Sequence, residues 1–475
     1  MGVTLFGAFM VVLDTTVVNL GLPSLQRDFD TVEGIEWVVT AYLAAVGVTQ
    51  MCTGWASDRF GRKRSFVFAL GLFTVASALC AAAPSLELLV IARILQGIGG
   101  GLLMPVGMAM IYELFEPDER GKALGYFGIA VMAAPAIGPV LGGSLVSSLG
   151  WRWLFLINLP VGLVGVPLAM RLLRDTGYRE ARPLDRAGLA LGGLGLAALM
   201  IGLSRAGEAG WTRPEVPVLL VAAVVLLALF VRHGLRVSQP LVDLRIFANP
   251  VFAIGMAVIG MMAMAQYTRL VYIPLELGTL RGIGEFRIGL IMLPSALCMA
   301  LTMPIGGRTV DRIGGRVPVT IGVTVLGLSF VGLAMLRIDS PLWMVSGLLA
   351  LGGLGSGLSM MAPNIQAMNA VKASQVSQAS GLSNVSRQVS AAIGTAVVAS
   401  LFATFRPDDG ATGAEALEPY RLVFLVAVGL LAGAVVVAQF LPGREKALAL
   451  QAERRAESST GGDAARVEPV HADLA

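Results

Sequence analysis

The segment GWASDRFGRKR, residues 54–64, lies between two apolar stretches of the chain. Four of its residues recur at a constant spacing in the second half of the sequence. The matching pairs are Gly54 and Gly307, Asp58 and Asp311, Arg59 and Arg312, and Gly61 and Gly314. Repeats of this kind in membrane proteins produce two similar bundles that move about a central site. The sequence therefore predicts two related halves.

The composition indicates that both halves lie in a lipid bilayer. Of the 475 residues, 56% are hydrophobic and only 14% are charged, whereas an ordinary soluble domain has about 25% charged residues. Apolar runs long enough to cross roughly 30 Å of hydrocarbon recur along the whole sequence. They predict an all-α membrane protein with fourteen spanning helices. These begin near residues 2, 35, 65, 86, 121, 153, 184, 216, 250, 285, 317, 341, 377 and 421.

Polar linkers divide the predicted helices into groups. The segments Arg171–Arg186 and Arg232–Pro250 enclose two helices, with six before them and six after. We expect a six-helix bundle at 1–175, two extra linker helices at 176–245 and a second six-helix bundle at 246–441. The polar segment 442–475 lacks a spanning run, and its composition is typical of a disordered tail.

The distribution of basic residues predicts the orientation of the chain. Most of the 35 Lys and Arg residues fall in the even-numbered loops and in the tail, and cytoplasmic loops retain such residues. Both termini are therefore expected in the cytoplasm. The first apolar run has neither a basic segment before it nor a small-residue cleavage site after it, so it is interpreted as a helix and not a signal peptide. The strong preference for Arg over Lys suggests a bacterial chain, and hence the inner membrane.

Several chemistries have no basis in this sequence. It contains no Gly-x-x-x-x-Gly-Lys-Ser/Thr phosphate loop, and its two histidines lie outside the predicted helices. Its three cysteines are isolated in apolar runs, which fits neither a disulfide framework nor a metal site. We therefore expect neither an enzyme nor an ATP-driven pump, with no cofactor, no metal and no nucleic-acid partner.

Two charged residues stand out inside the apolar segments. Asp14 lies about 18 Å along the first helix when its length is counted from Gly2. A carboxylate at that depth must be neutralised or paired, so Asp14 is a candidate proton site, with Arg93 as the residue that tunes it. Two alternatives remain open: a permanent structural pair between these residues, or an Arg93 side chain that extends outward to the membrane surface.

Other polar residues suggest a substrate cavity. Gln266, Arg269, Tyr272 and Glu276 follow one face of the ninth predicted helix, and they either line an outer vestibule or anchor that helix at the interface. In the thirteenth helix, Asn384 and Arg387 belong to a polar stripe that lines a cavity or forms helix contacts. Together with Gln96, these are the candidate substrate residues.

Four local motifs resemble the major facilitator superfamily. Residues 54–64 resemble its loop signature, in which the acid at the Asp58 position, with the neighbouring Arg62, holds the two bundles together at the cytoplasmic gate. Leu89, Arg93, Gln96, Gly97 and Gly99 resemble its second motif. The motif of its exporters is matched by Pro135, Gly138, Pro139, Gly142 and Gly143, although Ala134 replaces the first family glycine. Residues 13–23 resemble a signature of the fourteen-helix drug/proton antiporters.

The resemblance implies a fold and a function. It predicts two pseudo-symmetric six-helix bundles with two extra helices, working by alternating access. Protons would be the coupling ion, and amphipathic or cationic small molecules would be exported in multidrug efflux by a monomer in the lipid bilayer. An exporter of a lipid or an endogenous metabolite with the same fold remains an alternative. A proton-coupled nutrient symporter is a further one, which the exporter motif in the fifth helix disfavours.

Overall fold

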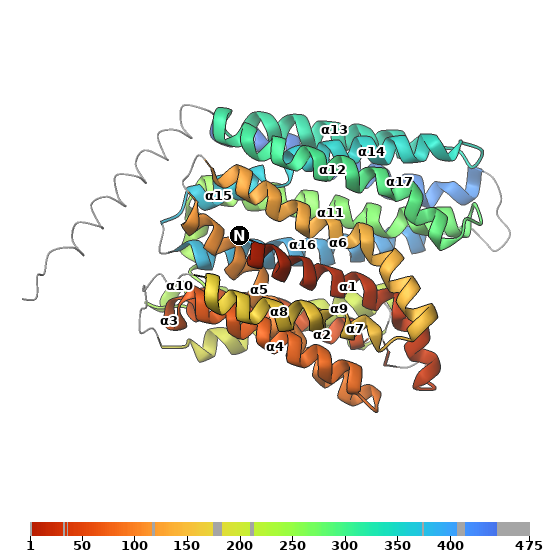
Figure 1. Ribbon diagram of the computed structural model, residues 1–475. Coiled ribbons are helices and arrows are strands. Elements are labelled where there is room, and N and C mark those ends of the chain that lie inside the picture. Colours follow the sequence, from red (N-terminus) through yellow and green to blue (C-terminus); the bar gives the residue numbers. More distant parts are fainter. Residues whose placement is uncertain are drawn as a thin grey trace, which may run out of the picture.

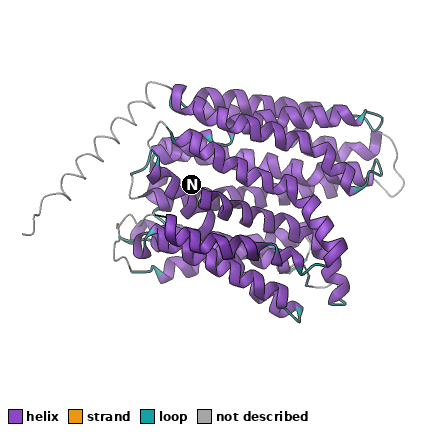
Figure 2. Cartoon of the chain, in the orientation of Figure 1, coloured by secondary structure: helices purple, strands orange, loops and turns teal. Residues whose placement is uncertain are grey.

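The computed structural model describes residues 2–31, 34–35, 37–115, 119–173, 183–209, 213–372, 375–405 and 414–443. This part of the chain is helical almost throughout, and its only β-bridge pairs Gly314 with Gly443 (Figure 2). The prediction of an all-α membrane protein is confirmed.

The helices before the linker form the first half of the molecule (Figure 1). They are α1 (Gly2–Asp28), α2 (Trp37–Met51), α3 (Thr53–Phe60), α4 (Arg62–Ala82), α5 (Leu86–Leu114), α6 (Arg120–Leu149), α7 (Trp153–Leu156) and α8 (Asn158–Leu172). The linker helices are α9 (Arg186–Ala209) and α10 (Glu215–Arg236), and the short 3₁₀ helix η1 (Leu244–Ala248) follows them.

The second half begins at Pro250. Its helices are α11 (Pro250–Thr279), α12 (Glu285–Ile313), α13 (Arg316–Ala334), α14 (Leu342–Ser359), α15 (Ala362–Asn369), α16 (Val376–Thr404) and α17 (Ala414–Ala438). Asn249 caps α11 because its side chain accepts hydrogen bonds from the backbone N–H groups of Val251 and Phe252.

Within the described residues, eleven helices are long and apolar enough to cross a membrane. The number rises to twelve if α2 and α3 form one span, bent by 55° at Cys52. Two further helices, α1 and α6, are 27 and 30 residues long. The predicted total of fourteen stays a prediction.

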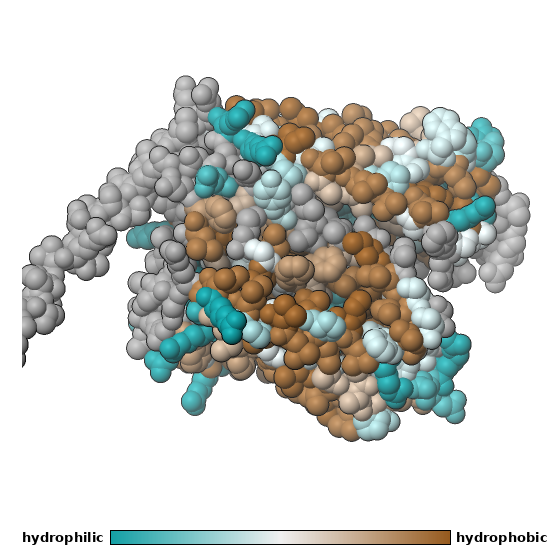
Figure 3. Space-filling view, viewed as in Figure 1, coloured by the Kyte–Doolittle hydropathy of each residue, from teal (hydrophilic) through white to brown (hydrophobic). Residues whose placement is uncertain are grey.

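The outer surface supports a bilayer environment. Large apolar side chains such as Leu163, Val218 and Leu301 are more than 60% exposed. In Figure 3, hydrophobic residues cover the middle of the visible face, and hydrophilic residues gather toward its two ends. Such an apolar band is the pattern that lipid contact requires.

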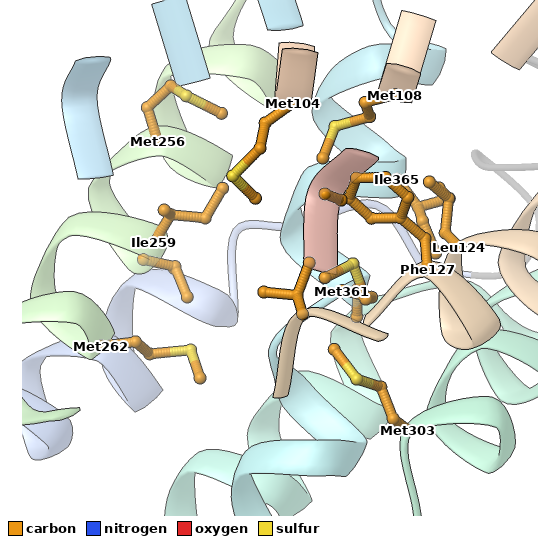
Figure 4. Packing of buried hydrophobic residues seen from close by; sticks show 14 of the residues in the cluster. Met104, Met108, Leu124, Phe127, Met256, Ile259, Met262, Met303, Met361 and Ile365 are labelled. Carbon is orange, nitrogen blue, oxygen red and sulfur yellow. The ribbon is translucent and has the colours of Figure 1, made fainter. Parts of the chain in front are cut away.

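The interface between the two halves is rich in methionine side chains. Helix α6 packs against α12, and α16 packs against α2, α3, α5 and the linker helix α9. Figure 4 shows apolar residues of α5, α6, α11 and α12 gathered in one cluster with Met361 and Ile365. Of these, Met104, Met108, Met256, Met262 and Met303 are buried. Because methionine is unbranched and polarisable, such an interface can repack as helices move.

Candidate functional site

Asp14 lies within α1, near the middle of its length, and its side chain is 0% exposed. Its Oδ2 accepts a hydrogen bond from Arg93 NH1 at 2.6 Å. Its Oδ1 accepts hydrogen bonds from Gln96 Nε2 at 2.8 Å and from Asn158 Nδ2 at 3.0 Å. The carboxylate therefore joins α1 to α5 and α8, and three donors compensate for its removal from water.

Arg93 of α5 is also 0% exposed, so its side chain does not extend to the membrane surface. Its Nε donates to the carbonyl oxygen of Val38 at 2.9 Å, and NH1 also donates to Gln96 Oε1 at 2.7 Å. The guanidinium carbon lies 3.9 Å from the centre of the Tyr42 ring, a cation–π arrangement. Arg93 would therefore keep several partners if Asp14 lost its charge.

A second layer of polar residues surrounds the pair. Ser77 Oγ accepts hydrogen bonds from Gln96 Nε2 at 2.8 Å and from Asn158 Nδ2 at 3.4 Å. Among the described residues, the Tyr42 hydroxyl and Asn158 Oδ1 are buried without a hydrogen-bond partner. Ser77, Asn158 and Tyr42 were not predicted as site residues from the sequence. The available signal was a polar side chain inside an apolar run, which is expensive in hydrocarbon unless it has a partner.

A glycine brings the helices of this site close together. A Cβ atom at Gly97 would lie 2.7 Å from the carbonyl oxygen of Tyr42 and 2.8 Å from the Cβ of Ala45. Only a residue without a side chain allows α5 to approach α2 so closely. This approach places Arg93, one turn earlier on α5, over the ring of Tyr42.

The gate residues predicted in residues 54–64 lie at one end of the bundle, where α4 and α13 begin with Arg62 and Arg316. We call it the basic end. Gly61 and its repeat partner Gly314 both have positive φ angles, 83° and 80°, and both follow the last residue of a helix. The repeat is therefore present in the backbone as well as in the sequence.

Several contacts between the halves lie at this end. Arg62 Nε donates to Ser377 Oγ of α16 at 3.2 Å, and Arg62 NH1 donates to the carbonyl oxygen of Ala109 at 3.4 Å. Gly54 packs against Gln378, and Gly381 packs against the carbonyl oxygen of Gln50. We call the residues Gly54, Arg62, Ser377, Gln378 and Gly381 the basic-end seam.

The remaining gate residues occupy different environments. Asp58 is buried, with 6% of its surface exposed. Arg59 and Arg312 are exposed. The Asp311 side chain lies outside the described residues, so its predicted role at the gate stays a prediction.

The predicted antiporter hinge falls within α6, which is helical from Arg120 to Leu149. The side chains of Pro135 and Pro139 lie outside the described residues. Gly138 faces α1, because a Cβ there would lie 2.6 Å from Thr16 Cγ2. Gly142 is buried, whereas a Cβ at Gly143 would have no neighbour within 4 Å. Gly138 is thus one point of close contact between α1 and α6.

The candidate cavity residues of α11 form two separate groups. Arg269 NH2 donates to Gln266 Oε1 at 2.8 Å, and Gln266 Nε2 donates to Ser356 Oγ at 3.1 Å. Glu276 is 2% exposed and pairs with Arg281 at 3.0 Å.

Tyr272 packs on Phe402, with ring centres 5.1 Å apart. In α16, Arg387 NH2 donates to Asn384 Oδ1 at 2.9 Å. In the part of the chain that the structure describes, none of these residues bonds to Asp14 or Arg93.

The protein-family model described as Major Facilitator Superfamily matches residues 4–395 of this chain. The chain belongs to this superfamily. It is a transporter and not an enzyme. The "Multidrug resistance protein B homolog" of Mycobacterium tuberculosis (strain H37Rv) is 30% identical over 485 aligned positions, covering 94% of this chain and 90% of that protein. The "Multidrug resistance protein Stp" of the same species (strain CDC 1551) is 34% identical over 403 positions, covering 84% and 74%.

Solved structures of the superfamily share the fold. The proton:xylose symporter XylE, bound to 6-bromo-6-deoxy-D-glucose, superposes with a TM-score of 0.65 at 17% identity, covering 94% of this chain and 98% of XylE. The human organic anion transporter MFSD10 also gives a TM-score of 0.65, at 18% identity, with coverages of 92% and 98%. At these identities the likeness concerns the fold alone.

Proposed function

We propose that this multi-pass membrane transporter is a proton-coupled antiporter that exports amphipathic or cationic small molecules by alternating access. The observation that carries the proposal is the fully buried ion pair between Asp14 and Arg93 within a transporter fold. Relatives named for multidrug resistance support the direction and the type of cargo. The proposal includes fourteen spans, the eleven apolar helices together with the α2–α3 pair, α1 and α6.

Protonation would act through the bonds that Asp14 makes. A neutral carboxyl group loses its ionic attraction to Arg93, while Arg93 keeps Val38, Gln96 and the Tyr42 ring as partners. The link from α1 to α5 and α8 therefore weakens, while the Arg93 side chain stays bonded to residues of α2 and α5. A proton and a substrate that both affect this link would compete, and such competition is the requirement for exchange.

The basic-end seam supplies the second element of alternating access. Its contacts join α3 and α4 to α16, and they must break before a path can open at that end. In the proposal this end faces the bacterial cytoplasm together with both termini. We further propose that the transporter works as a monomer in the inner membrane, with protons as its coupling ion and without a cofactor.

Transport in membrane vesicles tests the proposal directly. Everted vesicles containing the full chain should take up ethidium when a pH gradient, acidic inside, is imposed. Asp14→Asn should remove the dependence on the gradient, because the amide cannot be ionised. Asp28→Asn is the matched control, since Asp28 ends the same helix with 46% of its side chain exposed. Gradient-driven uptake by Asp14→Asn at the rate of the unmodified chain would overturn the proposal.

A further inference from the structure

Arg269 in α11 is a buried cation without a carboxylate partner. Its exposed fraction is 9%. Its NH2 group donates to Gln266 Oε1, but NH1 is buried and has no hydrogen-bond partner among the residues that the structure describes. No ion pair involves Arg269 among those residues. Burying an unpaired charge is costly in a protein and more so in a membrane, so this arrangement calls for an explanation.

The acid nearest to Arg269 in sequence on this helix is already engaged. Glu276 lies two turns further along the same helix face and pairs with Arg281 at 3.0 Å. Arg281 is held in place because it also donates to the carbonyl oxygens of Ser340 and Arg337, at 2.8 and 3.1 Å. Glu276 is therefore neutralised by a fixed partner and not by Arg269.

The surroundings of Arg269 are polar and small. A Cβ built on Gly352 of α14 would lie 2.7 Å from Arg269 NH1. The same Cβ would lie 2.7 Å from the Ser329 hydroxyl oxygen of α13. Gln266, which receives the bond from Arg269, is only half-buried and donates to Ser356. Three helices thus surround a cation, with small residues on one side and a partly exposed amide on the other.

We propose that Arg269 and Gln266 form an anion subsite that receives a carboxylate, or another singly charged anionic group, of the exported molecule. The inference rests on the proposed export function and extends the cargo to amphiphiles that carry an anionic group, zwitterions included. A carboxylate would accept the free NH1 hydrogens of Arg269 and the Gln266 amide hydrogen that is not donated to Ser356, and so supply the counter-charge for Arg269. A purely cationic cargo would not find a partner at this place.

Chloride from the medium could supply the same chemistry, so the test must separate the two sources. Binding of 4-(1-pyrenyl)butyrate and of its methyl ester is measured on the purified full-length chain in nanodiscs, in a carboxylate-free buffer with and without sodium chloride. The two probes differ in one negative charge. The acid should bind about tenfold more tightly than the ester, or better, in both media, as expected for one charge-assisted hydrogen bond.

Variants assign the preference to the site. Arg269→Gln should bind acid and ester alike, and Arg269→Lys should keep part of the preference. Arg337→Gln is the control, because it removes the same charge from a side chain that is 77% exposed. A thermal melt of each variant establishes that it is folded, and Gly352→Ala, which crowds NH1 without removing the charge, gives a second route to the same loss.

The outcomes have separate meanings. Equal binding of acid and ester by the unmodified chain, or an undiminished preference in folded Arg269→Gln, would overturn the proposal. A preference seen without chloride but absent in its presence would assign the subsite to chloride and overturn the assignment to cargo. Gradient-driven ethidium transport tests the export function independently, so an active exporter without the preference would lose the subsite alone.

Discussion

Arg93 and Arg269 are both buried in long apolar helices, one in each half of the chain, but their partners differ. Arg93 has the Asp14 carboxyl group at 2.6 Å, a backbone carbonyl group, an amide and an aromatic ring. Arg269 has the Gln266 amide, and one of its two terminal nitrogens has no partner among the described residues. Arg93 NH2 likewise has no hydrogen-bond partner among those residues, so the two sites differ in their counter-charge: Arg93 is paired with the Asp14 carboxyl group, whereas Arg269 gains such a partner only when an anion enters.

The difference separates two tasks of a transporter. A complete charge pair can store and release a proton while its helices stay packed, because both states of the carboxyl group find partners. An incomplete site binds only what the protein lacks. In this chain the N-terminal half would therefore respond to the proton, and the C-terminal half would select the cargo by charge.

The largest expected effect breaks the pair in the N-terminal half. Asp14→Leu and Arg93→Leu should each cost about 3–5 kcal/mol of stability, because each leaves an uncompensated buried charge. The double variant should cost clearly less than either single variant. Unfolding in mixed detergent micelles measures all three free energies. Additive losses would show that the pair is not coupled, and the contrast between the two halves would then fail.

Substitution of the unpaired arginine should have the opposite sign. Arg269→Met removes a buried cation without stranding a carboxylate, and Met has a similar length. We expect a gain of about 1–4 kcal/mol, the range observed when buried ion pairs are replaced by apolar side chains. The same detergent assay gives the value. A loss as large as that of Arg93→Leu would mean that Arg269 already has a strong partner.

The gain in stability would come with a loss of function, as is common at binding sites. Arg269→Met should therefore lose its preference for pyrenylbutyrate over the ester while it melts at a higher temperature. Stability and binding moving in opposite directions would distinguish a ligand site from a structural one.

The sequence predicted the charged residues of both sites but not their different environments. Apolar runs placed helices near 86, 153, 250 and 285, where α5, α7, α11 and α12 begin. The depth of Asp14 and the presence of Arg93 follow from helix geometry alone. The bond from Asn158 to Asp14, and the Ser77 hydroxyl that Gln96 and Asn158 share, do not follow from it, because α8 approaches α1, and α4 approaches α5 and α8, through tertiary packing that has no fixed spacing in the sequence.

The missing partner of Arg269 was equally beyond sequence reasoning. Glu276 lies seven residues later on the same helix face, so helix periodicity alone would allow it to pair with Arg269. The structure assigns it to Arg281, in the turn after α11, which local periodicity does not cover. Which of two arginines a carboxylate chooses depends on the loop that holds the second one, here through the carbonyl groups of Arg337 and Ser340.

Two glycine substitutions sharpen the comparison with a smaller effect. In Gly97→Ala the new methyl group would meet the Tyr42 carbonyl oxygen at 2.7 Å and the Ala45 side chain at 2.8 Å, so α2 and α5 must separate. We expect a loss of about 1–3 kcal/mol, as for an overpacked core. In Gly352→Ala the nearest atoms are the end of the Arg269 side chain and the Ser329 hydroxyl, which can move. The same unfolding assay should show a smaller loss, and equal losses would indicate that Arg269 is as rigidly fixed as Arg93.

The smallest expected effect concerns the basic-end seam between the two halves. Ser377→Ala removes the acceptor of the Arg62 bond at 3.2 Å, for a loss of about 0.5–1.5 kcal/mol that favours opening at the basic end. Cys52, half-buried at the bend between α2 and α3, can report this opening in a variant that lacks Cys80 and Cys298. Its alkylation by N-ethylmaleimide should become about twofold to tenfold faster. Ser148→Ala, on an exposed part of α6, should leave the rate unchanged. If Ser377→Ala also leaves it unchanged, the two halves are held at the basic end by packing around Gly54 and Gly381, and the Arg62 bond is incidental to the gate.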